Sequence, residues 1–144
     1  MKVVSFLQAE QQKLTTCAAE ETIESVAKRL SALNIGALPV CGANFSLVGV
    51  ISERDVVRGM AKDGCKLAER RVRDLMTREV VFCDHNTTMA EAEKLMYQKR
   101  VRHLPVVDGG KVVGLLSIRD VMAWRIQESK TELNVLRDMA IVSR

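Results

Sequence analysis

The chain has 144 residues, of which 47% are hydrophobic, a size that suits one ordinary domain or two very small units with a shared core. Its formal net charge of +4 comes from scattered basic residues, and only 3% of residues are aromatic, a composition that argues against a nucleic-acid-binding surface. The apolar part of residues 1–10 is too short for a secretory signal or a membrane span. We therefore expect a cytoplasmic protein without membrane contact.

An internal repeat divides the chain into two units. Residues 22–40 align without a gap with residues 88–106, an offset of 88 − 22 = 66, and Pro39 and Pro105 keep this offset. The stretch GVISERD at residues 49–55 recurs as GLLSIRD at residues 114–120, an offset of 114 − 49 = 65. The lost residue falls in a Gly-rich segment between two apolar runs, which predicts a hairpin turn.

The elements predicted for the first unit, in chain order, are a strand at 14–17, a helix from Thr22, strands at 37–40 and 47–51, and a helix that begins at Ser52. Those predicted for the second unit are a strand at 80–83, a helix from Thr88, strands at 104–107 and 112–116, and a helix that begins at Ser117. One such unit is too small to bury its apolar surface alone. We therefore predict an α+β fold in which two β-α-β-β-α units pack as a pseudo-two-fold pair.

The domain division that follows from the repeat has four parts. Residues 1–67 hold the N-terminal segment and the first unit, 68–79 form an ordered connector, 80–125 form the second unit, and 126–144 form a helical tail. The tail has a coiled-coil-like seam with spacings of 4, 3, 4, 3 and 4, made of Met122, Ile126, Ser129, Leu133, Leu136 and Ala140. This seam either helps to lock a homodimer or packs on its own chain.

The repeated GxxSxRD stretch has two interpretations. Ser52 with Asp55, and Ser117 with Asp120, have the spacing of a helix N-cap, in which each side chain bonds the other's backbone amide. Capping does not require the glycine three positions before the serine or the intervening arginine, and both copies keep both residues. The repetition therefore favours an additional role for the motif.

The second interpretation is a nucleotide site. A helix that starts where a strand ends offers free amides and a positive dipole to a phosphate, and Arg54 or Arg119 can add bidentate donors. The aspartate is an acceptor suited to ribose hydroxyls. Gly49 and Gly114 would remove side-chain bulk where the ligand approaches the strand.

An apolar slot for the base is predicted around the two prolines. Ile35 and Val101 would flank the base, with Thr15 and Val81 opposite. The remaining residues assigned to the two sites are Thr16, Gly36, Ala37, Pro39, Arg102, His103 and Pro105.

The paired segments GALPV…GVISERD and HLPVVDGGKVVGLLSIRD resemble the two halves of a tandem CBS domain pair, named after cystathionine β-synthase. The resemblance covers residues 14–122. It implies a non-catalytic regulatory module, commonly dimeric, that senses AMP, ADP, ATP, NAD(H) or S-adenosylmethionine and signals to a partner protein. By position, the serines would meet phosphate or ribose, the aspartates ribose, the arginines phosphate, and the backbone at Gly36-Ala37 and Arg102-His103 adenine.

The two halves are not identical. Glu53 stands where the second copy has Ile118, and Gly36-Ala37 stands where it has Arg102-His103. We therefore expect the second site to hold the more anionic ligand. His103 has a simpler alternative, a hydrogen bond to the main chain.

The sequence contains no nucleophile-base pair at a readable spacing and no acidic cluster for a metal, so we predict no catalytic cofactor and no metal. AMP is the expected ligand. Two other functions stay open at this point. One is a nucleic-acid-associated accessory protein, and the other is a thiol switch formed by Cys17 and Cys83, which occupy equivalent positions.

Overall fold

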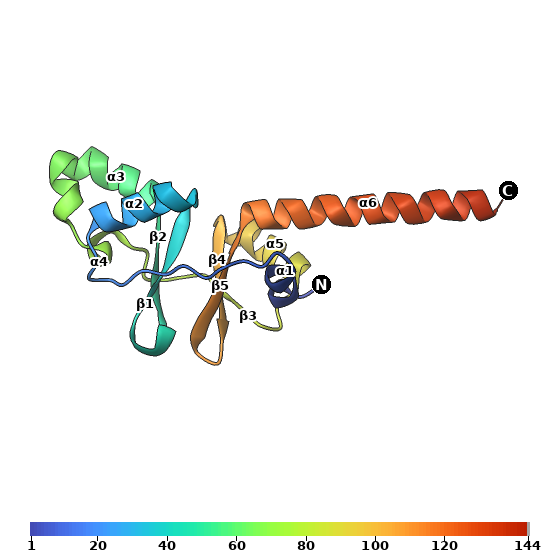
Figure 1. Ribbon diagram of the computed structural model, residues 1–144, viewed down its shortest axis with the longest axis horizontal. Coiled ribbons are helices and arrows are strands. Elements are labelled where there is room, and N and C mark those ends of the chain that lie inside the picture. Colours follow the sequence, from blue (N-terminus) through green and yellow to red (C-terminus); the bar gives the residue numbers. More distant parts are fainter. Residues whose placement is uncertain (144) are drawn as a thin grey trace.

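The computed structural model describes residues 1–143, which form a mixed α+β fold of two repeated units and a long C-terminal helix. The first unit contains α2 (Ile23–Leu33), β1 (Ala37–Cys41), η1 (Ala43–Phe45), β2 (Leu47–Ser52), α3 (Glu53–Asp63), η2 (Gly64–Glu69) and α4 (Val72–Leu75). The second contains β3 (Cys83–Asp84), α5 (Met89–Lys99), β4 (His103–Asp108), β5 (Lys111–Ser117) and α6 (Ile118–Val142). A short helix, α1 (Val3–Ala9), precedes both units in the chain. Figure 1 shows the two hairpins standing side by side, with their helices on the outer flanks.

The predicted hairpins and helices are present. β1 pairs antiparallel with β2, and β4 with β5, with Ala37 opposite Ser52 and His103 opposite Ser117. The hydroxyl oxygen of Thr22 accepts from the amide of Ser25 and thereby caps α2, and Thr88 caps α5 in the same way. The repeat thus sets the same hairpin register in both units.

The strands predicted at 14–17 and 80–83 are much shorter in the structure. Cys17 alone forms an isolated parallel bridge, with Val40, and β3 is limited to Cys83–Asp84. The residues before Cys17 instead cross from α1, which lies on the second unit, to the first unit (Figure 1). Because this extended segment has to span both units, only its last residue reaches the first sheet. Its other residues therefore form no strand pairing with β1.

Helix α1 packs in the core of the second unit, although the sequence division grouped it with the first. Val3, Phe6 and Leu7 join the core cluster that also contains Leu104 and Leu116. In the first unit the equivalent place is taken by α4 in the connector, where Val72 is fully buried. The bridges Lys2↔Thr88 and Thr22↔Arg71 show this equivalence, since Thr22 and Thr88 are related by the repeat offset.

Helix α6 runs without a break from Ile118 to Val142, so no secondary-structure boundary separates the second unit from the predicted tail. Within residues 1–143, no helix combines the length and apolar character that a bilayer crossing needs.

Candidate functional site

The start of α3 and the start of α6 have the same capped geometry. The amide of Ser52 donates to Asp55 Oδ2 at 2.9 Å, and the amide of Asp55 donates to Ser52 Oγ at 3.4 Å. In the second copy, the corresponding distances for Ser117 and Asp120 are 2.8 and 3.2 Å. The capping interpretation is therefore confirmed in both units, and each cap uses one carboxylate oxygen of the aspartate.

The first-turn amides are less available to a phosphate than the sequence suggested. Besides the capped amides, the amide of Glu53 donates to the carbonyl of Gly36 at 2.9 Å. The amide of Ile118 donates to the carbonyl of Arg102 at 2.8 Å. Since these amides already have protein acceptors, charged side chains have to supply most of the binding for an anion at either helix start.

Three arginines are placed to do so. Arg54 and Arg119 lie in the first turns of α3 and α6, and Arg102 directly precedes β4; all are exposed. None of the three forms an ion pair with another residue in the described part of the chain. Their guanidinium groups can therefore donate bidentate hydrogen bonds to an anion from outside the chain.

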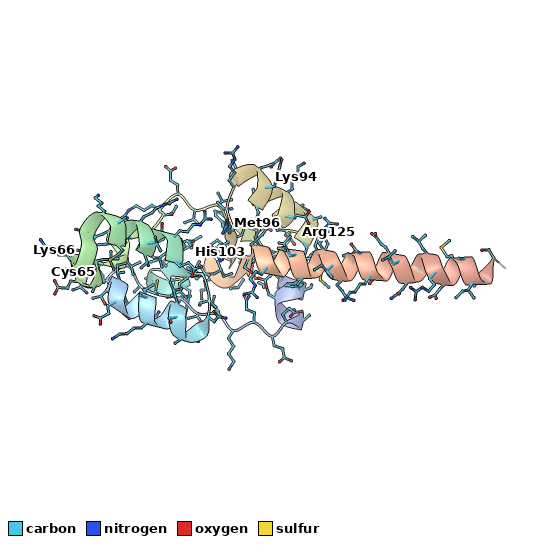
Figure 2. All side chains as sticks on the ribbon, turned by 90° about the horizontal axis from the view of Figure 1, so that it is seen from above. Cys65, Lys66, Lys94, Met96, His103 and Arg125 are labelled. Carbon is cyan, nitrogen blue, oxygen red and sulfur yellow. The ribbon has the colours of Figure 1, made fainter. Side chains whose placement is uncertain are left out.

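His103 lies where the two units meet. Figure 2 places it close to the start of α6 and beside the first unit. The position that a Cβ atom would occupy at Gly36 is 3.4 Å from His103 Nε2 and 3.3 Å from Glu53 Oε1, so both side chains converge over this glycine. Burial lowers the pKa of His103 below 6.5, with Arg102 acting in the same direction and Glu53 and Asp120 opposing. The imidazole is therefore held largely neutral at neutral pH and next to both helix starts.

Gly49 and Gly114 allow close packing within the protein. The atoms that approach these two glycines belong to the chain itself and not to a ligand. A Cβ atom at Gly49 would lie 2.8 Å from both Met76 Sδ and the carbonyl oxygen of Thr77. At Gly114 it would lie 2.6 Å from Leu7 Cδ1. The segment after α4 in one unit and α1 in the other thus cover the repeated glycine, which corrects the ligand-approach interpretation.

Pro39 and Pro105 are buried, and their carbonyl groups bind protein atoms. The amide of Cys17 donates to Pro39 O at 3.0 Å, and the thiol of Cys83 lies 3.8 Å from Pro105 O. Ala37 is 1% exposed at the start of β1. These residues form the wall between the units, and the two prolines do not leave their own carbonyls free for a base edge.

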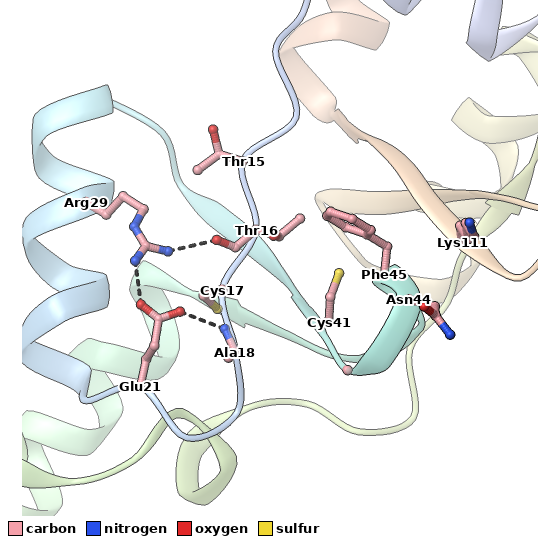
Figure 3. A pocket seen from close by; sticks show the side chains of 11 residues that line it. Thr15, Thr16, Cys17, Ala18, Glu21, Arg29, Cys41, Asn44, Phe45 and Lys111 are labelled. Atoms are coloured by element: carbon pink, nitrogen blue, oxygen red, sulfur yellow. Dashed lines mark hydrogen bonds and ion pairs between the residues drawn. The ribbon is translucent and has the colours of Figure 1, made fainter.

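An open pocket of about 670 Å³ lies at the hairpin ends of the two units. Thr15 and Thr16 line it together with Arg29, Phe45 and Lys111 (Figure 3). Arg29 donates to the carbonyl of Thr16 at 2.8 Å and is ion-paired with Glu21.

Val101 lines a second cavity, of about 460 Å³, with Ile118 against α5. The other predicted base contacts, Ile35 and Val81, pack against the first and second core clusters respectively. Neither cavity includes Ser52, Asp55, Ser117 or Asp120. The pocket of the predicted threonine contacts therefore contains no residue of either helix start, whereas Val101 shares its pocket with Ile118, the first residue of α6.

Cys17 and Cys83 are not placed to form the thiol switch considered from the sequence. Cys17 and Cys83 belong to different core clusters and are 5% and 4% exposed. Burial raises the pKa of Cys17 to about 12 and that of Cys83 to about 11. All four thiols are free, and the positions of these two contradict a switch that joins them.

Sequence reasoning did not select the approach of Glu53 and His103 over Gly36, or Arg29 and Lys111 in the pocket at the hairpin ends. A signal for the role of His103 was available, because the equivalent position in the first unit is Ala37. No local pattern specifies the second, because Arg29 and Lys111 come from different units and line one pocket only through the packing of the hairpins.

Comparison with known proteins identifies the repeat. The profile of the CBS domain family matches residues 10–62 and 72–126. The mitochondrial CBS domain-containing protein CBSX3 of Arabidopsis thaliana is 32% identical over 124 residues, which are 83% of this chain and 60% of that protein. The chain thus spans less than two thirds of this relative's length.

Solved structures agree. The CBS-domain containing protein ATU1752 from Agrobacterium tumefaciens is 33% identical with a TM-score of 0.80, over 87% of this chain and 99% of that one. CBSX2, solved in complex with AMP, is 26% identical with a TM-score of 0.74, over 83% and 92%. The CBS domain pair of MJ0100, in complex with 5′-methylthioadenosine and S-adenosyl-L-methionine, is 26% identical with a TM-score of 0.71, over 83% and 92%. With both repeats matched by the family profile and a fold shared with solved CBS pairs, this chain belongs to the CBS domain family.

Proposed function

We propose that this chain is a non-catalytic sensor that binds an adenosine-containing nucleotide, AMP first among them, between its two CBS motifs and signals occupancy to a partner protein. The observation that carries the proposal is the approach of both capped helix starts to His103, through Glu53 and Asp120, with the exposed Arg54 and Arg119 in the first turns of the same helices. The binding of AMP and of S-adenosylmethionine by two relatives supports the adenosine part.

Each chemical group of a nucleotide has a candidate partner. The oxygen of Asp55 or Asp120 that the cap does not use can accept from ribose hydroxyls, and Arg54 or Arg119 can bind phosphate from the same helix turn. ADP, ATP and NAD(H) share these groups with AMP. No catalytic step is assigned, because these residues provide binding and no general base beside a reacting atom.

The two motifs differ in charge, and this sets their order of affinity. Glu53 places a carboxylate beside the first helix start, and the second copy has Ile118 there. Arg102 adds a positive charge next to the second motif. We therefore expect the second motif, with Ser117, Arg119 and Asp120, to bind the more anionic ligand.

Isothermal titration calorimetry with AMP tests the proposal. Asp55→Asn and Asp120→Asn keep an acceptor for the helix cap and remove the charge. The loss of a charged hydrogen bond predicts an affinity about tenfold to a hundredfold lower, with the larger loss for Asp120→Asn. Asp74→Asn is the matched control, because Asp74 caps α4 through the amide of Arg71 at 3.1 Å, away from these helix starts.

Three results would count against the proposal or a part of it. If the folded wild-type chain binds none of AMP, ADP, ATP and NAD(H), the nucleotide assignment is wrong. If Asp74→Asn lowers AMP affinity as much as the other two variants, the aspartates act on stability and do not contact the ligand. Equal losses from Asp55→Asn and Asp120→Asn would refute the predicted difference between the motifs.

A further inference from the structure

The C-terminal half of α6 stands away from the rest of the chain. Arg125 Nη2 bonds Glu93 Oε2 on α5 at 2.8 Å, and beyond Arg125 the helix projects into solvent (Figure 1). Every residue from 125 to 143 is exposed. The alternative that this face packs on its own chain is therefore wrong.

The projecting helix has an uncovered apolar stripe. We call the residues at the predicted coiled-coil spacing the α6 seam, which consists of Met122, Ile126, Ser129, Leu133, Leu136 and Ala140. Met122, Ile126, Leu133 and Leu136 are 58%, 55%, 63% and 62% exposed. A single helix of this length is marginal in water unless an apolar face is covered, so the helix needs a partner.

We propose that the partner is a second copy of this chain, whose α6 seam packs against the first in a parallel, in-register coiled coil. The spacing supports a helical partner, because alternating steps of 4 and 3 keep one stripe facing a neighbouring helix along its whole length. The charged residues beside the seam indicate that the partner helix is a second α6 and that the two helices run parallel.

In the parallel arrangement, residues that flank the seam meet partners five positions later in the second copy. Glu132 of each copy then faces Arg137 of the other, which gives two attractive pairs by symmetry. Arg125 would face Lys130 of the second copy, but its charge is already matched by Glu93 within its own chain. The parallel arrangement therefore gains the attractive Glu132–Arg137 pairs, and Glu93 reduces the repulsion of the Arg125–Lys130 pairs that oppose them.

The antiparallel arrangement that buries the same seam is disfavoured. Flanking residues then meet their own kind near the crossing point, so Glu132 faces Glu132 and Lys130 faces Lys130. Like charges at such distances are destabilising. A second copy in the parallel direction is thus the occupant that the charge pattern fits.

Light scattering coupled to size-exclusion chromatography of the full chain at micromolar concentration is the first test. We expect twice the mass of one chain, and a return to the monomer mass in Leu133→Lys/Leu136→Lys. Val135→Lys is the matched control, because Val135 is 52% exposed on the same helix but lies off the seam, and it should stay dimeric. A monomeric wild-type chain, or a dimer that survives the double substitution, would overturn the proposal.

A cysteine cross-link tests the direction and register. Only a parallel, in-register pair brings the two copies of residue 129 face to face, so Ser129→Cys should form a disulfide dimer under mild oxidant. The exposed Cys65 is first replaced by serine to remove competing cross-links. Thr131→Cys, on the outer face, should cross-link at least tenfold more slowly. Equal rates for the two variants, or a faster Thr131 cross-link, would overturn the parallel arrangement.

Discussion

Replacement of Gly49 by alanine separates the packing role of the repeated glycine from a role in ligand binding. The added methyl would lie 2.8 Å from the carbonyl oxygen of Thr77 and from Met76 Sδ. Thr77 cannot retreat easily, because its amide and carbonyl both pair with Val50, at 2.9 and 3.0 Å. The substitution therefore forces either the methyl or this backbone pair to move.

The expected cost follows from two opposing terms. Alanine in a strand is about 0.5–1 kcal/mol more stabilising than glycine, because the unfolded chain loses less conformational entropy on folding. Overpacking against a constrained neighbour costs about 1–3 kcal/mol. The contact with a paired backbone oxygen places Gly49→Ala towards the upper part of that range, so we expect a net loss of about 1–2 kcal/mol in the free energy of unfolding.

Urea unfolding and AMP calorimetry, performed on the same preparation, measure the two roles separately. We expect the free energy of unfolding to fall, and AMP affinity to stay within about twofold of wild type at temperatures where the variant is folded. A variant of wild-type stability that has lost AMP binding would refute the packing argument. It would restore the interpretation that a ligand approaches this glycine.

Gly114 offers an internal check, since its added methyl would meet a side chain, Leu7 Cδ1, at 2.6 Å. Leu7→Ala alone should cost about 2–5 kcal/mol, because it leaves a cavity in the second core. In Gly114→Ala/Leu7→Ala the methyl fills part of that cavity. The combined loss should therefore be smaller than the sum of the single losses, and strict additivity would show that the two positions do not touch.

Two further predictions concern titrating groups. NMR titration should give His103 a pKa below 6.5, and stability present above pH 6.5 should be lost as the pH falls through this lower value, because the unfolded chain binds the proton more readily. His103→Gln should weaken this acid sensitivity of the urea midpoint, and a pKa of 6.5 or higher for His103 would contradict the burial argument. Thiol titration of the native protein at mildly alkaline pH should label the exposed Cys65 and leave Cys17 and Cys83 unreacted, and rapid labelling of either would contradict their burial.

The repeated units were predictable because their signals are local. The spacing of Ile23, Val26 and Leu30, the threonine caps and the Gly-rich turns are each set within a few residues of chain. The Ser-x-x-Asp caps at α3 and α6 were predictable for the same reason. The constant offset between the repeats then implied that the chain holds two copies of one unit and that the two copies pack against each other.

The assignment of α1 and the role of the glycines could not be obtained in this way. The contacts of Leu7 with Gly114 and of Thr77 with Gly49 join residues far apart in the chain, and which unit a short helix covers depends on the path of the segment before Cys17. The same holds for Glu53 and His103, which meet over Gly36 only because the two units face each other.

The amino-acid sequence by itself determined the two-unit α+β fold, the capped helix starts and the seam of α6, because hydrophobic period and capping chemistry act over one or two helical turns. Only the tertiary structure decided that the glycine of GxxSxRD is covered by protein, that Cys17 and Cys83 lie in separate cores, and that the α6 seam has no cover within its own chain. These outcomes depend on which surfaces are brought together, and close packing between distant segments leaves no periodic trace in the sequence.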